Sequence, residues 1–276
     1  ILIFYIMKND NKINPTQRAK YWNNSYVKYW KERVKEANDN STKDSKIVDG
    51  DKITTSDEIY DDAISFLKIN KNDNVLELGC GFGRSLDLLS NLAKKVTAVD
   101  ISVEMIDAAK SSVKKDNIEF YVSPSENLPL EDNIYDVVVC FAAFDAMYQQ
   151  ATLDEINRIS KIDARILITG KNDNYDDHDH DAMMAELGAR SKGHPNYFTD
   201  VKVLLKNIDS FGFELINSKY FLKRGDLGSN LFEDKISDSF YEYLFVFKKK
   251  KSCTSSNDLS LSNNVSKTYL RSIGQL

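Results

Sequence analysis

The sequence has few cysteines, no long apolar run and no surplus of positive charge, and each shortage excludes a class of protein. Its 3 cysteines, Cys80, Cys140 and Cys253, lie far apart and without the spacing of a metal site, which favours a reducing, cytoplasmic environment without disulfides. No apolar run approaches the ~18 residues that cross a bilayer. The formal net charge of −5 argues against a protein that binds nucleic acid. We therefore expect neither a membrane nor a nucleic acid as partner.

The composition divides the chain into three parts. Residues 1–50 form a polar N-terminal segment, which opens ILIFYIM, and we expect Met7 to be the true start. Residues 51–250 are predicted to form the main domain, with an insertion at 171–199 that is too long for an ordinary connection. Residues 251–276 are rich in Ser and Asn and show little apolar periodicity, which predicts a disordered tail.

The N-terminal segment contains one aromatic stretch, QRAKYWNNSYVKYWKERVKEA. Its aromatic residues recur at roughly helical spacing, which predicts an amphipathic helix or a pair of helices. An aromatic face of this kind usually packs against the domain. The alternative is a lid over a ligand site, and in that case we expect Tyr21 and Tyr26 to contact the ligand.

Short apolar runs alternate with helical stretches through the main domain. The runs are NVLELG, VTAVD, IEFYV, YDVVVCF and RILIT, each bounded by turn residues. Runs that are apolar on both faces are typical of buried parallel strands. Their alternation with helices predicts an α/β sheet covered on both sides. Two later runs, GFELINSKYF and YEYLFVFK, indicate an antiparallel hairpin at one edge.

The stretch NVLELGCGFGRS, residues 74–85, is a strand followed by a glycine-rich turn. It lacks the Gly-Lys pair of a P-loop. A dinucleotide fingerprint needs a third glycine where this chain has Arg84. The glycines are Gly79, Gly81 and Gly83, and Glu77 precedes them. Glycines at this spacing let a backbone approach a ligand without interference from Cβ atoms.

The pattern E-L-G-C-G-F-G resembles motif I of the class I S-adenosylmethionine-dependent methyltransferases. The resemblance implies a Rossmann-like, doubly wound, mostly parallel seven-stranded sheet with a C-terminal antiparallel hairpin, and S-adenosylmethionine as cofactor. It also implies that Glu77 receives the ammonium group of the cofactor, that Asp100 accepts the ribose hydroxyls at the end of VTAVD, and that Ile101 lies against the adenine.

Two further segments resemble the same family. In SPSENLPLEDNIYDVVVCF, the resemblance places Ser125 and Glu126 beside the adenine, whereas Pro124 stands where an aspartate is common. In RISKIDARILITG, residues 162–164 replace the usual Pro-Gly-Gly turn. The cofactor residues implied in this way are Glu77, Gly79, Cys80, Gly81, Gly83, Asp100, Ile101, Ser125, Glu126, Cys140 and Phe141.

Candidates for proton transfer come from Asp145 and from the insertion, which holds all three histidines of the chain, His178, His180 and His194. Histidine has a pKa suited to a general base near neutral pH. His178 and His180 stand among aspartates, but a solvated acidic loop explains that pattern better than a metal site, and we expect no metal.

The family resemblance implies methyl transfer, and absent motifs narrow the acceptor. The segment CFAAFDAM lacks the Asn/Asp-Pro-Pro-aromatic signature of enzymes that methylate base amino groups. We expect a small-molecule acceptor, with a hydroxyl of a sugar or metabolite as first choice and a protein group as second. A nicotinamide-dependent oxidoreductase and a non-catalytic cofactor-binding module are the alternatives from other classes.

Overall fold

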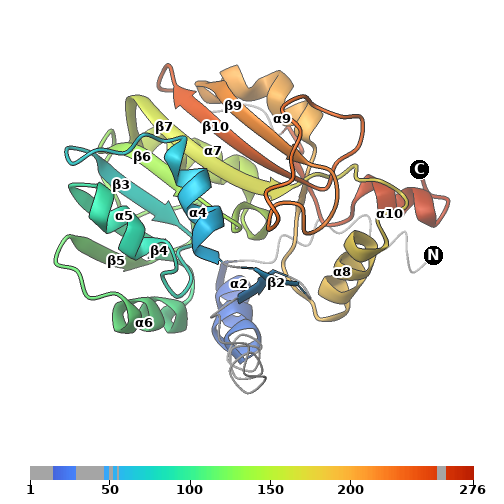
Figure 1. Ribbon diagram of the computed structural model, residues 1–276, viewed down its shortest axis with the longest axis horizontal. Coiled ribbons are helices and arrows are strands. Elements are labelled where there is room, and N and C mark those ends of the chain that lie inside the picture. Colours follow the sequence, from blue (N-terminus) through green and yellow to red (C-terminus); the bar gives the residue numbers. More distant parts are fainter. Residues whose placement is uncertain (1–14, 29–46, 50–51, 55, 254–258) are drawn as a thin grey trace.

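The computed structural model describes residues 15–28, 47–49, 52–54, 56–253 and 259–276 (Figure 1). The expectations for Met7 and for the aromatic stretch beyond residue 28 therefore lie outside the described residues, as does the side chain of Tyr26. No helix among the described residues is long and apolar enough to cross a membrane.

One seven-stranded sheet organises the domain, with the strand order β5-β4-β3-β6-β7-β10-β9. The parallel strands are β3 (Asn74–Leu78), β4 (Lys95–Asp100), β5 (Ile118–Val122), β6 (Tyr135–Cys140) and β7 (Ser160–Lys171). Strands β9 (Phe213–Phe221) and β10 (Glu242–Lys249) form an antiparallel hairpin, which joins the sheet where β10 pairs with β7. This confirms the predicted mostly parallel sheet with its C-terminal hairpin.

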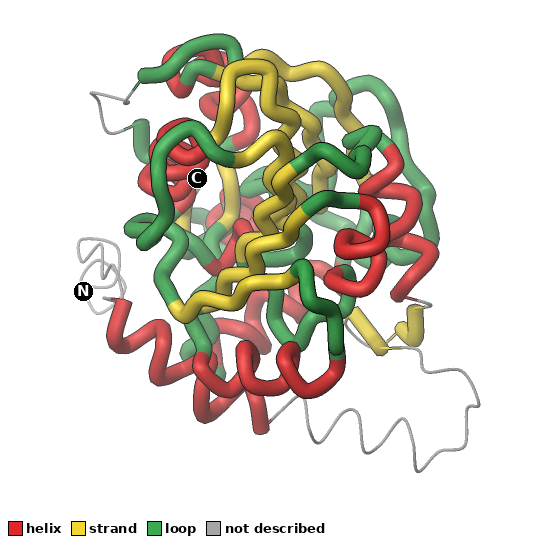
Figure 2. The backbone as a smooth tube through the Cα atoms, turned by 90° about the vertical axis from the view of Figure 1, so that its left-hand side faces the viewer, coloured by secondary structure: helices red, strands yellow, loops and turns green. Residues whose placement is uncertain are grey.

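Helices cover both faces of the sheet (Figure 2). Side chains alternate along each strand, so that Leu76 and Val75 of β3 enter different hydrophobic clusters. The first cluster contains α7 (Gln149–Ile159), α9 (Val201–Asn207) and the 3₁₀ turns Phe144–Ala146 and Ile208–Phe211. The second contains α4 (Ser56–Ser65), α5 (Leu86–Leu92) and α6 (Val103–Ser112). The sheet is therefore buried between two hydrophobic clusters, one on each face.

The N-terminal helix α2 (Pro15–Lys20) continues directly into η1 (Tyr21–Tyr26), which is a π-helix. A π-helical turn is rare and is often found at functional sites. Asn23 of η1 accepts a hydrogen bond from the Ser102 hydroxyl (2.7 Å), and Ser102 is the residue that caps the start of α6. This segment therefore lies against the end of the sheet where β4 stops. A small hairpin follows, β1 (Ile47–Asp49) with β2 (Lys52–Thr54).

Residues 162–164, which stand in place of a Pro-Gly-Gly turn, lie within the first part of β7, where its pairing with β6 is irregular. Helix α7 ends at Ile159, and Asp163 adopts a left-handed φ of 66°. Among residues with a side chain, aspartate is one of those that tolerate this conformation. Asp163 thus supplies the left-handed residue at this irregularity without a glycine.

The tail prediction was wrong for residues 259–276. Strand β11 (Ser262–Asn263) pairs with β8 (Phe198–Thr199), and α10 (Lys267–Ser272) follows. Helix α8 (His180–Ser191) supplies Glu186, a buried acceptor for the Ser266 hydroxyl at 2.6 Å. Lys267 bonds Asp200 at 2.6 Å. Polar partners in the insertion and directly after it hold the tail, so its low apolar content did not reveal that it is ordered.

Candidate functional site

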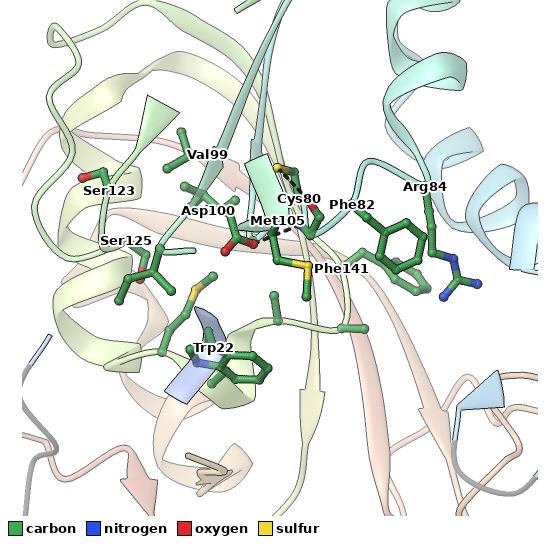
Figure 3. A pocket seen from close by; sticks show the side chains of 18 of the residues that line it. Trp22, Cys80, Phe82, Arg84, Val99, Asp100, Met105, Ser123, Ser125 and Phe141 are labelled. Atoms are coloured by element: carbon green, nitrogen blue, oxygen red, sulfur yellow. Dashed lines mark hydrogen bonds between the residues drawn. The ribbon is translucent and has the colours of Figure 1, made fainter. Parts of the chain in front are cut away.

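A pocket opens at the carboxyl ends of β3, β4 and β6 (Figure 3). In open α/β sheets this is the edge where ligands bind. Four groups of residues surround the pocket: the N-terminal helix, α4, the glycine loop, and the segments after β4, β5 and β6. The lining residues are Arg18, Trp22, Tyr60, Leu78, Gly79, Cys80, Gly81, Phe82, Arg84, Val99, Asp100, Ile101, Met105, Ser123, Ser125, Phe141, Ala142, Ala143, Ala146 and Met147.

Gly79 allows the glycine loop to pass close to the segment after β6. Its φ is 69°, and a Cβ at this position would lie 2.5 Å from the Cβ of Ala143. No side chain fits at that distance, so the position requires glycine for both backbone conformation and space. Gly81 also has a positive φ, of 53°, but a Cβ there would meet no atom within 4 Å. The loop thus presents bare backbone to the pocket.

Asp100, the last residue of β4, lies half-buried in the wall of the pocket. One carboxylate oxygen accepts the Gly81 N–H at 3.0 Å and the other accepts the Ser102 N–H at 2.8 Å. Burial raises the pKa of Asp100 to about 6, although these N–H donors favour the charged form. The carboxylate is therefore held in a fixed orientation and can accept further hydrogen bonds from hydroxyl groups.

Glu77 is buried on β3, just before the glycine loop. The Ser85 hydroxyl donates to one carboxylate oxygen, and the other oxygen has no hydrogen-bond partner among the described residues. Burial, and to a lesser extent the charge of Asp100, raises the pKa of Glu77 to about 7. An unpartnered buried carboxylate oxygen is costly unless a donor or a cation reaches it. The geometry therefore calls for a positively charged group near the glycine loop.

The N-terminal helix closes one side of the pocket. Arg18 is buried, forms an ion pair with Glu126, and lies 4.1 Å above the ring of Tyr148. Trp22 reaches into the pocket from η1 (Figure 3). An ion pair and a ring contact of this kind fix the helix against the segments that follow β5 and β6.

His194 of the insertion contacts the same helix. Its Nδ1 atom lies 2.8 Å from the Tyr21 hydroxyl, and its ring centre lies 5.0 Å from that of Trp22. Burial, with the nearby charge of Lys171 as a second cause, lowers the pKa of His194 to about 4, so that the ring is neutral at neutral pH. Lys171 in turn bonds Asp145 at 2.5 Å. The insertion and the N-terminal helix thus meet beside the pocket.

Residues 76–168 match the family model described as a methyltransferase domain. The chain carries a class I S-adenosylmethionine-dependent methyltransferase domain. This family uses S-adenosylmethionine as its methyl donor.

Curated relatives match the methyltransferase domain over part of their length. An uncharacterized methyltransferase of Schizosaccharomyces pombe is 33% identical over 101 residues, which cover 36% of this chain and 39% of that protein. A malonyl-[acyl-carrier protein] O-methyltransferase of Bacillus anthracis is 42% identical over 77 residues, covering 27% and 28%. A ribosomal protein L11 methyltransferase of Thermotoga neapolitana is 30% identical over 115 residues, covering 39% and 41%. The chain therefore spans less than half the length of these relatives.

Solved structures share the fold. The Haloferax volcanii putative methyltransferase, solved in complex with the Trm112 methyltransferase activator, gives a TM-score of 0.57 at 15% identity and covers 85% of this chain and 98% of that chain. YcgJ of Bacillus subtilis gives 0.53 at 16% identity, covering 70% and 98%. At these identities the likeness concerns the fold alone.

The methyltransferase domain brings seven of the eleven cofactor residues implied by motif and position into the lining of the pocket. They are Gly79, Cys80, Gly81, Asp100, Ile101, Ser125 and Phe141. Of the other four, Gly83 and Cys140 pack in the interior, Glu77 lies buried near Asp100, and Glu126 faces Arg18. Tyr21, one of the two lid candidates, contacts His194 instead of lining the pocket.

The base candidates separate into two places. Asp145 and His194 lie near Lys171 beside the pocket of the methyltransferase domain. His178 and His180 are exposed at the start of α8 and do not line the pocket. In the part of the chain that the structure describes, no group of three or more His, Cys, Asp or Glu residues could hold a metal ion.

Sequence reasoning missed several residues that line the pocket, above all Arg18, Trp22, Tyr60 and Arg84. Three of them precede β3 in the chain and reach the pocket only through the tertiary fold. Arg84 directly follows the last glycine of the motif, and its charge was the signal that could have identified it.

Proposed function

We propose that the protein binds S-adenosylmethionine in this pocket and transfers its methyl group to a hydroxyl of a small molecule, a sugar or another metabolite. The observation that carries the proposal is the pair of carboxyl groups at the glycine loop. Asp100 is oriented by two N–H donors, and Glu77 has a buried oxygen without a partner. A ligand with a diol at one place and an ammonium group at another satisfies both.

The remaining lining residues fit the same ligand. The absence of a side chain at Gly81, where a Cβ would enter open space, lets the amino-acid part approach the loop. Ile101 and Met105 supply apolar surface for a base, and the Ser125 hydroxyl, held by Thr152 at 2.8 Å, supplies a polar group beside it. The chain's part in the chemistry is to orient donor and acceptor in line and to exclude water, while the bound cofactor supplies an electrophilic methyl group.

Enclosure supports a small acceptor. Phe141 and Ala142, which follow β6, line the pocket, and Trp22 and the Tyr21–His194 contact lie at its side. A pocket with the N-terminal helix along one side, and the insertion in contact with that helix, favours a small molecule over a folded protein. His194, which is neutral at neutral pH, and Asp145 lie beside the pocket and stay our candidates for the group that takes a proton from an acceptor hydroxyl.

A protein acceptor is the second candidate. Relatives named ribosomal protein L11 methyltransferases match this chain at 27–30% identity. The matches cover less than half of those proteins, so they support the transferase domain more than the acceptor.

The proposal can be tested by calorimetric titration with S-adenosylhomocysteine, with NAD as the control ligand. We expect binding of S-adenosylhomocysteine by the wild type and a loss of about 10- to 100-fold in Asp100→Asn, because charge-assisted hydrogen bonds to the ribose disappear. Asp107→Asn, an exposed carboxylate on α6, is the matched control and should bind like the wild type. Binding of NAD without S-adenosylhomocysteine would overturn the proposal.

The acceptor class is tested separately with methyl-labelled S-adenosylmethionine and a cell extract. Label in the small-molecule fraction that resists base hydrolysis agrees with an ether or N-methyl product, and mass analysis then separates the two. Label confined to protein would replace the small-molecule acceptor with the second candidate.

A further inference from the structure

One side of the pocket is not needed by the groups that suit the cofactor. Asp100, Ser123 and Ser125 follow or end β4 and β5, whereas β6 lies on the other side of β3 in the sheet. The segment after β6 and the N-terminal helix form what we call the β6 side of the pocket. Its lining residues are Trp22, Phe141, Ala142, Ala143, Ala146 and Met147. This side remains for the acceptor.

The β6 side is apolar. Its lining residues are aliphatic or aromatic, and the indole N–H of Trp22 is the one good hydrogen-bond donor among their side chains. Arg18 reaches this side through the Ala146 carbonyl at 3.4 Å, but its charge is paired with Glu126. A sugar carries several hydroxyls, and each loses free energy when it leaves water without a hydrogen-bond partner. Among the described residues, the β6 side therefore suits an apolar acceptor better than a sugar.

Trp22 gives the β6 side a large aromatic surface. Its ring centre lies 5.0 Å from that of His194 and 5.4 Å from that of Tyr21, and both contacts are edge-to-face. Two such contacts restrict rotation of the indole. Trp22 is half-buried and lines the pocket at the edge away from Ser123 (Figure 3). A fixed indole of this kind favours a second aromatic ring as its partner, stacked or edge-to-face.

The backbone that follows β6 is also held in place. Ala142 has a left-handed φ of 52°, which residues with a Cβ rarely adopt, and its N–H donates to the buried Thr169 hydroxyl at 2.7 Å. Ala143 packs against Gly79, where a Cβ would lie 2.5 Å from the Ala143 Cβ. Strained backbone of this kind clusters at ligand sites. A fixed wall of small side chains, in the same pocket as the Trp22 ring, suits a flat molecule.

We propose that the acceptor is a flat aromatic compound that stacks on Trp22 and presents a hydroxyl attached to its ring. The inference rests on the proposed function and narrows its acceptor from a sugar or other metabolite to a phenol. The phenolic oxygen forms a bond to the methyl carbon. The bond between that carbon and the sulfonium sulfur breaks, its electron pair stays on sulfur, and the phenolic proton passes to a base.

The acidity of a phenol fits the two candidate bases. The pKa of His194 is lowered to about 4 by burial and by the charge of Lys171, so the ring is a weak base. Asp145 is bound to Lys171 at 2.5 Å. A phenolic hydroxyl has a pKa of about 10, whereas an aliphatic hydroxyl, like water, loses its proton far less readily. Weak bases therefore suffice for a phenol more readily than for a sugar.

The test supplies methyl-labelled S-adenosylmethionine with glucose and with three matched pairs: phenol and cyclohexanol, catechol and trans-1,2-cyclohexanediol, 2-naphthol and decahydro-2-naphthol. The members of each pair share their carbon skeleton and hydroxyls and differ in the saturation of the ring. We expect label in at least one aromatic compound, transferred about 10-fold faster or more than to its saturated partner or to glucose. Trp22→Leu should raise the KM for that compound about 3- to 10-fold, with little change in kcat or in affinity for S-adenosylhomocysteine. Trp22→Phe, which keeps a ring, should retain most of the affinity.

Phe232→Leu is the matched control, because Phe232 is an exposed aromatic residue between β9 and β10 that does not line the pocket. Equal rates within every pair, label in none of the aromatic compounds, or an unchanged KM in Trp22→Leu would overturn the inference. Titration with S-adenosylhomocysteine separates this failure from that of the proposed function. A wild type that does not bind it overturns both, whereas binding without transfer to the aromatic compounds overturns the inference alone. Thermal unfolding of each variant confirms that folded protein was assayed.

Discussion

Cofactor affinity should rise with pH, because two carboxyl groups at the site must be charged to receive the ligand. The pKa of Glu77 is about 7 and that of Asp100 about 6, both raised by burial. An ammonium near Glu77 and hydroxyl donors at Asp100 favour the charged forms, so that binding lowers both pKa values and releases protons. Protonation of either group therefore competes with the ligand.

The size of the effect follows from these two pKa values. Between pH 6 and pH 7.5, the charged fraction of Glu77 rises about eightfold and that of Asp100 about twofold, so that affinity should increase about 16-fold if only the charged forms bind. At pH 7, Glu77 is half protonated, and binding should release about half a proton from it. The amine of S-adenosylhomocysteine belongs to a free amino acid, whose charged carboxylate keeps the ammonium protonated over this range, so it adds little to the change.

Calorimetric titration of S-adenosylhomocysteine in phosphate and in Tris measures both quantities, because the two buffers differ in ionisation enthalpy. Glu77→Gln should lose most of the pH dependence, and the smaller contribution of Asp100 should persist. Affinity that is constant from pH 6 to pH 7.5, or protons taken up on binding, would refute the reasoning.

Three further outcomes are expected. Glu77→Gln should raise the free energy of unfolding of the ligand-free protein by on the order of 2–3 kcal/mol at pH 8, since it removes a buried charge. The pKa of Glu77 is higher in the folded protein than in the unfolded chain, so this gain should vanish as the pH falls to about 4.5. Urea unfolding at several pH values measures the gain, and a gain that does not change with pH would contradict the prediction. Gly79→Ala should lower the melting temperature more than Gly81→Ala, because only Gly79 has a neighbour in the space of a Cβ; equal losses would argue against the close approach. Tyr21→Phe removes the hydroxyl that bonds His194. It should increase the rate at which S-adenosylhomocysteine dissociates several-fold, measured by stopped flow, with little change in melting temperature. An unchanged rate would show that this contact does not hold the helix over the ligand.

The sheet was predictable because its signal is local. The runs of β3, β4 and β6 are apolar on both faces, and residues such as Val75, Leu76 and Val138 are buried whichever way they point. The glycine motif was predictable for a similar reason, since the backbone conformation and the limited space at Gly79 require a glycine at that position of the sequence. The start of α6 is a local feature of the same kind, because the Ser102 side chain accepts the Met105 N–H and caps the helix.

The parts that were missed depend on contacts between distant residues. Ser266 and Lys267 order the tail through Glu186, Asp173 and Asp200, and nothing in the tail's own composition shows these partners. Arg84 gains its place in the pocket from the ring of Tyr60, 24 positions earlier in the chain, and from the lack of an acidic neighbour among the described residues. Periodicity and motif spacing do not encode either relation.

A crystal structure of the protein with S-adenosylhomocysteine tests the central claim most directly. We expect the ligand in the pocket of Figure 3, with its ribose hydroxyls on Asp100 and its ammonium toward Glu77. A ligand bound elsewhere, or bound in this pocket with its ribose away from Asp100, would contradict the account.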